Sequence, residues 1–140
     1  MKNQATRLVT IGIALAAAVA VHAQDKTISA DVPFSFYMGS SLMPQGVYRV
    51  NEFAQSAVVG IDTAQGATSK AVTTINIDRR KQAEPAKLVF HRYGSNYFLA
   101  EIWTGDSSAG RALARSPREK ELAKSAAGTH LAMIAVYPNR

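Results

Sequence analysis

Apolar and polar residues alternate along much of the chain with the period of two that is typical of β-strands. The segment TISADVPFSFY, residues 27–37, shows this most clearly, since every second position is apolar: Ile28, Ala30, Val32, Phe34 and Phe36. Side chains in a strand point alternately to its two faces, so this pattern predicts a half-buried strand. Pro33 has no backbone N–H to donate to a ladder, so we expect this strand to lie at a sheet edge or to bend there.

Six further segments are rich in branched and aromatic residues and predict strands bounded by turn or loop sequences. They cover residues 47–53, 57–62, 69–77, 88–93, 97–103 and 129–138. The sequence MPQG at 43–46 places proline and glycine where they favour a tight turn, and Gly66 lies in a second predicted turn. The polar segment 78–86 is expected to be an exposed loop.

The segment LVFHRYGSNYFLAEIW, residues 88–103, predicts a β-hairpin whose arms are joined by Gly94–Asn96. Both faces of the two arms carry mostly apolar residues, so we expect the hairpin to lie centrally and to be covered on both sides. Strict alternation divides the second arm into two sets that face opposite sides: Phe98, Ala100 and Ile102 on one, and Tyr97, Leu99, Glu101 and Trp103 on the other.

A short helix is predicted in SPREKELAKSAAG, residues 116–128. Ser116 is the expected N-cap, Pro117 takes the first helical position and Glu119 follows three residues after the cap, which is the pattern of a capping box. Gly128 is the expected stop. Because its apolar content is low, the helix should lie on the surface, at an open end of the sheet. Together these elements predict a single all-β domain, a compact antiparallel barrel or sandwich of about seven to eight strands with one short helix near the C-terminus.

The amino end has the three-part pattern of a secretory signal peptide. Lys2 and Arg7 precede an uncharged apolar stretch at 8–21, and VHA at 21–23 offers a cleavage site after Ala23. A helix of this length rises only about 21 Å, whereas the hydrocarbon core of a membrane is about 30 Å thick. We therefore expect residues 1–23 to be a signal peptide and residues 24–140 to be one exported β-rich domain, located in the periplasm or outside the cell, without a stable membrane span.

The charge of the exported domain is modest. Without Lys2 and Arg7, fourteen basic residues stand against ten acidic ones, which leaves a net charge of +4. The basic residues are scattered rather than gathered in a stripe with aromatic residues between them, so nucleic acid is not an expected partner. The chain has no cysteine, which excludes disulfides and thiolate catalysis.

The polar residues give little sign of catalysis. His91 and His130 each lie inside an apolar predicted strand with no neighbouring metal-ligand residue, so neither a metal nor a cofactor is expected. Sequences typical of a serine nucleophile or of a phosphate-binding loop do not occur. The best candidates for an acid–base pair are His91 and Glu101, which could meet across the hairpin if the register allows it.

Aromatic residues of the hairpin are the other candidates. Tyr93, Tyr97 and Trp103, with Arg92 beside them, could form a platform on which a sugar or another ligand stacks. Aromatic rings also supply much of the area of protein cores, and core packing is the favoured interpretation.

Three motifs together resemble a group of small exported bacterial β-rich proteins. They are DVPFSFYMGSSLMPQGVYRV, the hairpin sequence LVFHRYGSNYFLAEIW, and GRALARSPREKELA, which together run from about Asp31 to Leu122. The group has no agreed catalytic residues, so the resemblance assigns no chemical role to any position.

The favoured hypothesis is a non-enzymatic exported protein that binds a ligand or partner at the cell envelope. The alternatives are a small hydrolase of envelope or extracellular polymers that uses His91 and Glu101, and a protein that self-associates through the edge strand carrying Pro33.

Overall fold

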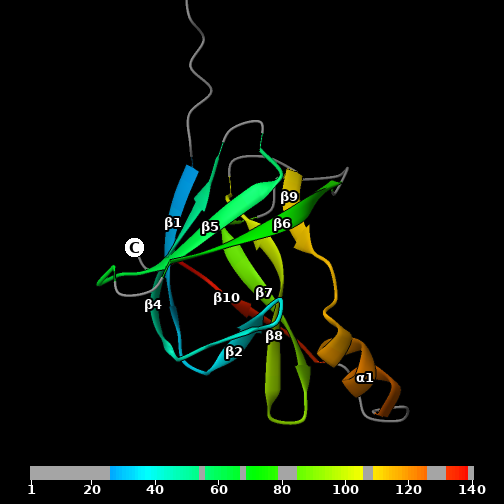
Figure 1. Ribbon diagram of the computed structural model, residues 1–140. Helices are drawn as coiled ribbons and strands as arrows, with labels where there is room; N and C mark the ends of the chain where they lie inside the picture. The colour runs from blue at the N-terminus through cyan, green and yellow to red at the C-terminus, as the bar shows by residue number, and fades with distance from the viewer. Residues whose placement is uncertain are drawn as a thin grey trace, which may run out of the picture.

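Ten strands and one helix make up the part of the chain that the computed structural model describes, which is residues 26–53, 56–66, 69–78, 85–105, 109–125 and 132–138 (Figure 1). The elements in chain order are β1 (Lys26–Val32), β2 (Phe36–Met38), β3 (Ser41–Met43), β4 (Gly46–Glu52), β5 (Val58–Thr63), β6 (Ser69–Asp78), β7 (Lys87–Tyr93), β8 (Asn96–Trp103), β9 (Ala109–Leu113), α1 (Pro117–Ser125) and β10 (Ala132–Val136). The predicted all-β fold with one short helix is confirmed. The predicted signal peptide lies outside the described residues.

The strands form one curled sheet, in the order β1-β4-β5-β6-β9-β8, which continues from β8 through β7 to β10. The short hairpin β2–β3 adds to β8 beside β9, through the single parallel pair of Tyr37 with Phe98. The other pairs are antiparallel. β6 is the longest strand and is shared, because Ser69–Thr73 pairs with β5 and Thr74–Asp78 pairs with β9. The described strands do not close into a barrel, since β1 and β10 approach each other without forming a ladder.

The first predicted strand is divided at Pro33 into β1 and β2. β1 ends at Val32 and stands at one end of the sheet order, so the prediction that Pro33 marks an edge or a bend is confirmed. Its predicted apolar face is also confirmed, since the five alternating residues belong to the core or pack against it: Ile28, Ala30, Val32, Phe34 and Phe36. The physical cause is the pleat, which keeps these side chains on the inner surface of the curl.

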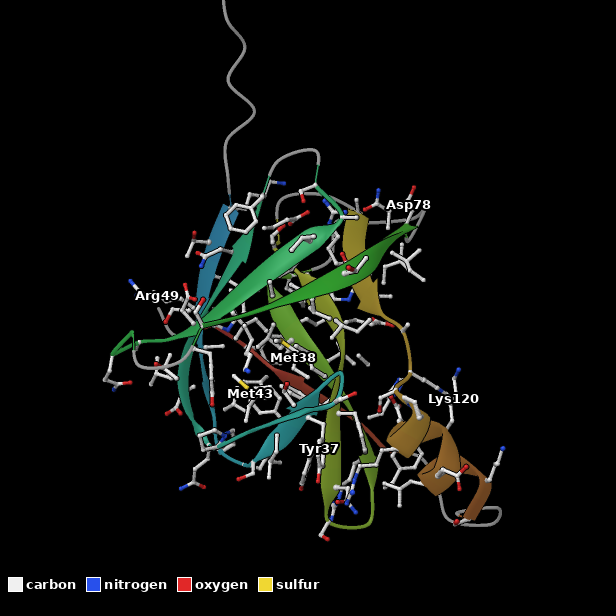
Figure 2. The ribbon with its side chains drawn as sticks, viewed as in Figure 1. Tyr37, Met38, Met43, Arg49, Asp78 and Lys120 are labelled. Carbon is white, nitrogen blue, oxygen red and sulfur yellow. The ribbon has the colours of Figure 1, made fainter. Side chains whose placement is uncertain are left out.

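The core fills the space inside the curled sheet. Phe36 contacts Tyr48 and Phe90 edge to face, with ring centroids 5.2 Å apart in both pairs. Met38 and Met43, from the β2–β3 hairpin, point into the same space (Figure 2) and are buried. The Tyr48 hydroxyl donates to the carbonyl of Pro44, which joins the core to the predicted tight turn between β3 and β4. Burial of these apolar side chains is the main stabilising contribution to the fold.

The hairpin β7–β8 is central and buried on both faces, as predicted. The side chains of β8 do not alternate strictly between the two faces, because a β-bulge interrupts the ladder. Val89 is opposite Glu101 and Phe90 is opposite Leu99, which leaves Ala100 as the extra residue. Phe90 is opposite Leu99, and Leu88 is opposite Ile102, so Leu99 and Ile102 both reach the core although they are three residues apart. The predicted division of the second arm into two faces is therefore wrong beyond the bulge, where one extra residue reverses the alternation.

Sequence patterns did not predict β9. Its sequence, AGRAL, has few of the branched and aromatic residues that favour strands, and its pairing with β6 and β8 holds it extended. A side chain at Gly110 would overlap the indole ring of Trp103, which is fully buried. The small residue in β9 therefore makes room for the largest side chain of the neighbouring strand.

Helix α1 begins as predicted. The Glu119 backbone N–H donates to Ser116 Oγ at 3.2 Å, and the Lys120 N–H donates to the Ser116 carbonyl at 3.0 Å. The helix lies beside the turn of the β7–β8 hairpin (Figure 1), and Glu119 is its buried residue. Gly128, the predicted stop, lies outside the described residues. Among those residues, no helix has the length and apolar character needed to cross a membrane.

Candidate functional site

The predicted acid–base pair is not formed. In the β7–β8 ladder His91 is opposite Phe98, whereas Glu101 is opposite Val89. The Glu101 carboxylate instead accepts a hydrogen bond of 2.8 Å from the indole N–H of Trp103. The pairing failed because the turn at Gly94–Ser95 sets the register near His91, which places His91 opposite Phe98 rather than Glu101. His130 lies outside the described residues.

His91 meets a different carboxylate, that of Glu119 on α1. Its Nδ1 lies 2.7 Å from Glu119 Oε1, and the Tyr93 hydroxyl donates to the same oxygen at 3.1 Å. Arg115 Nε is 3.8 Å from that oxygen. The side chain of Glu119 is only 5% exposed and that of His91 17%. We call His91, Tyr93, Arg115 and Glu119 the Glu119 cluster.

The contacts of the Glu119 carboxylate differ from those that the local sequence predicts. The Ser116-x-x-Glu119 spacing predicts that the carboxylate reaches back to the N-cap, as in a capping box. The backbone half of that motif is present, because the Glu119 N–H donates to Ser116 Oγ. The carboxylate, however, turns to the sheet and binds His91 and Tyr93. Glu119 thus attaches the helix to the hairpin, a role that the sequence spacing did not indicate.

Aromatic rings surround the cluster. Phe98 contacts Tyr93 edge to face at 5.8 Å between centroids and stacks on Tyr37 at 5.0 Å. The Arg118 guanidinium lies over the ring of Tyr37, 5.0 Å from its centroid. Figure 2 shows Tyr37 between β2 and the β7–β8 hairpin. A buried carboxylate needs partners in such an apolar setting, and the cluster supplies them.

The remaining predicted ligand-binding residues are mostly engaged in packing. Trp103 is fully buried, so no ligand can stack on it, and Tyr93 is 7% exposed. Tyr97 is half-buried and stacks on Phe34 with centroids 3.8 Å apart. Arg92 is exposed, donates to the Gly94 carbonyl at 2.7 Å and lies over the Tyr97 ring. The structure does not bring the three aromatic residues together as one open platform.

The Glu119 cluster could orient an imidazole, as carboxylates do in catalytic sites, by fixing which ring nitrogen carries the proton. Here the same contacts hold α1 on the sheet. Among the described residues, every buried side-chain nitrogen or oxygen has a hydrogen-bond partner. The geometry is therefore that of a structural polar cluster whose members satisfy one another.

Two tyrosines have raised pKa values in the folded protein. Burial raises the pKa of Tyr93 above its ordinary value of 10.0, and the charge of Glu119 and the hydrogen bond to it raise it further, while Arg115 acts in the opposite direction. Burial also raises the pKa of Tyr48. Each phenol therefore holds its proton more tightly in the folded state than in the unfolded state.

This difference predicts a loss of stability at alkaline pH. Below about pH 10 both the folded and the unfolded state keep the tyrosine proton, so the stability contributed by the phenol is fully present. Above about pH 10 the unfolded state loses its proton first and becomes more favoured, until the pH reaches the raised pKa of the folded state. Between the two pKa values, each tyrosine lowers the free energy of unfolding by up to about 1.4 kcal/mol per pH unit. We expect the melting temperature of Tyr93→Phe to fall less than that of the wild type between about pH 8 and about pH 11.5. Tyr137→Phe, at a residue 59% exposed, is the control; equal profiles for wild type and Tyr93→Phe would contradict the assignment.

A cavity of about 500 Å³ lies where β6 leaves β5 and joins β9. One wall is fixed by Thr74, whose backbone N–H and hydroxyl both donate to the carbonyl of Ala57, at 2.7 and 2.8 Å. The described residues that line the cavity are Ser56, Ala57, Thr74, Ile75, Asn76 and Arg111. Its volume is within the range of about 300–1,000 Å³ that small-molecule sites occupy.

Arg111 is the charged residue among those that line the cavity, and two strands orient it. Its Nε donates to Glu52 Oε1 on β4 at 2.8 Å, and Nη1 donates to Asn76 Oδ1 on β6, directly opposite in the ladder. The side chains of Arg111 and Glu52 are 11% and 20% exposed. We call the cavity with Arg111 and Glu52 the Arg111 cavity. Sequence reasoning missed it, because it depends on β9 and on a contact between residues 59 positions apart.

No group of three or more metal-ligand side chains capable of holding an ion occurs among the described residues. No family model matches the sequence, and no curated protein or solved structure is significantly similar to the chain.

Proposed function

We propose that this chain is an exported, non-enzymatic protein that binds a small ligand at the cell envelope, and that the Arg111 cavity is its binding site. The observation that carries the proposal is the guanidinium of Arg111, which is largely enclosed, held by acceptors from two strands and set in the wall of a ligand-sized cavity. A group that is fixed before the ligand arrives loses little entropy on binding, which is a property of binding sites.

The residues of the Glu119 cluster are already engaged in structural contacts, which favours a binding function over a catalytic one. Its histidine and tyrosine hold a helix in place, and the predicted partner of His91, Glu101, binds Trp103 instead. A hydrolase based on His91 and Glu101 is therefore not proposed. Export is supported by the signal-peptide pattern of residues 1–23.

Two measurements on the full-length gene product test the proposal. When the complete chain is expressed in a bacterium with a periplasm, we expect the protein outside the cytoplasm with Gln24 as its first residue; a protein retained in the cytosol with residues 1–23 attached would contradict export. On that purified protein, amide NMR spectra recorded with a set of small polar and amphiphilic molecules should shift at Ser56, Thr74 and Asn76. A set of molecules that leaves these signals unchanged would contradict the binding site.

Self-association is a second proposal, favoured by the place of β1 at one end of the sheet order. Its outer edge offers backbone groups to a second copy, with Pro33 limiting the pairing at its carboxyl end. Sedimentation over a wide concentration range should show a dimer that Ile28→Pro abolishes, because proline removes a backbone donor from the strand. A strict monomer at high concentration would contradict it.

A further inference from the structure

We infer that the Arg111 cavity takes a monocarboxylate with an apolar body, and that Arg111 holds the carboxylate group. This inference rests on the proposed binding function and names the class of ligand.

The first step is the state of the guanidinium. Nε and Nη1 are used by Glu52 and Asn76, whereas no hydrogen bond joins Nη2 to any residue that the structure describes. Since no described buried side-chain atom lacks a partner, Nη2 is not fully buried and can be reached from the cavity. Arginine N–H groups form strong, directional hydrogen bonds to carboxylates and phosphates, so an oriented and accessible Nη2 favours an anionic group.

The second step is the charge around it. Glu52 lies against the guanidinium and offsets part of its charge. Asp78 is on the same face of β6, two residues beyond Asn76, and is exposed at the end of that strand (Figure 2). Two carboxylates near one arginine disfavour a dianion such as phosphate more than a single negative charge. The charges therefore favour a monocarboxylate.

The third step is the rest of the lining. Ala57 lines the cavity next to Thr74, so the ligand meets an apolar side chain near the arginine. The Asn76 side-chain oxygen accepts from Arg111, which leaves its amide N–H groups as donors. The side chain of Ile75 projects to the opposite face of β6, so it is the methyl group of Ala57 whose burial under a hydrocarbon body would add binding free energy.

The experiment compares acids with matched amides on the exported, purified protein. Hexanoate and the free acid of acetyl-alanyl-leucine represent a small aliphatic acid and a peptide C-terminus, and hexanamide and acetyl-alanyl-leucinamide lack the charge. We expect both acids, or one of them, to shift the amide signals of Ala57, Thr74 and Asn76, and the amides to bind about ten- to a hundredfold more weakly. The stronger acid identifies the source of the carboxylate.

Variants separate a binding role from a structural one. Arg111→Gln should weaken acid binding about ten- to a hundredfold. Glu52→Gln keeps the arginine and removes the competing charge, so it should strengthen acid binding and allow inorganic phosphate to bind. If Arg111→Gln does not fold, Glu52→Gln and the double variant Glu52→Gln/Arg111→Gln, which pairs two neutral amides, carry the test. Arg49→Gln, at an exposed arginine on β4 (Figure 2), is the control and should bind like the wild type.

Three results would overturn the inference. They are amides that bind as tightly as the acids, phosphate that binds the wild type more tightly than hexanoate, and a Glu52→Gln variant whose acid affinity falls or stays the same. If neutral molecules alone shift the cavity signals, the carboxylate inference fails while the proposed binding function stands. If no molecule shifts them, both fail.

Discussion

Gly110→Ala is expected to destabilise the folded protein by about 3 kcal/mol, the upper part of the range for overpacked core positions. A Cβ atom at this position would lie 2.7 Å from Trp103 Cε3 and 2.8 Å from Cδ2, well inside van der Waals contact. Neither partner can move easily. Gly110 is opposite Ile77 in the β6–β9 ladder, and Trp103 is fully buried with its indole N–H bound to Glu101.

Gly60→Ala is the matched control. Gly60 also lies in an interior strand, but its Cβ would meet the Phe53 ring at 3.4 Å, and that ring is 43% exposed and free to shift. We expect Gly60→Ala to change stability by no more than about 0.5 kcal/mol. Thermal unfolding of the two variants should therefore differ by roughly 10 °C. Equal melting temperatures would show that β9 does not pack on Trp103 as described.

His91→Ala is expected to cost about 2–3 kcal/mol, because it leaves the Glu119 carboxylate buried without its shortest hydrogen bond. Tyr93 remains at 3.1 Å and Arg115 at 3.8 Å, so part of the charge is still satisfied. Glu119→Ala should cost a similar amount, since it removes the contact that joins α1 to the hairpin. The double variant should cost less than the sum of the two, with a coupling free energy of about 1–2 kcal/mol.

Glu121→Ala serves as the control for the helix. Glu121 is on the same helix and exposed, so its loss should change stability by no more than about 0.5 kcal/mol. Urea unfolding of the four variants and the wild type gives the free energies. Additive effects of His91→Ala and Glu119→Ala would mean that the two side chains do not interact. A His91→Ala variant of unchanged stability would contradict the structural role of the cluster.

Structural elements whose formation depends only on residues close together in the chain could be predicted from the sequence. Alternation from Ile28 to Phe36 identified one face of the core, and Pro33 identified the edge, because both follow from the backbone geometry of a single strand. The N-cap at Ser116 and the tight turn before Gly46 were also local. The hairpin at 88–103 was located and its burial on both faces was correct.

The candidate site could not be predicted, because its contacts join residues far apart in the chain. The contact of His91 with Glu119 spans 28 positions, and that of Arg111 with Glu52 spans 59. The hairpin turn placed His91 opposite Phe98 rather than Glu101, and a single extra residue at the bulge placed Leu99 and Ile102 on the same face. Strand β9, which carries Arg111, was missed because its pairing with β6 and β8, rather than its composition, makes it a strand.

By itself, the sequence determined that this chain forms amphipathic strands and one capped helix, since hydrophobic periodicity and capping act within a few residues. Only the tertiary structure decided which polar side chains meet, because register, bulges and the approach of distant strands result from packing the whole core. Glu119 illustrates the difference. Its position three residues after Ser116 predicted a local cap, and the sheet beneath the helix made it the buried partner of His91 and Tyr93.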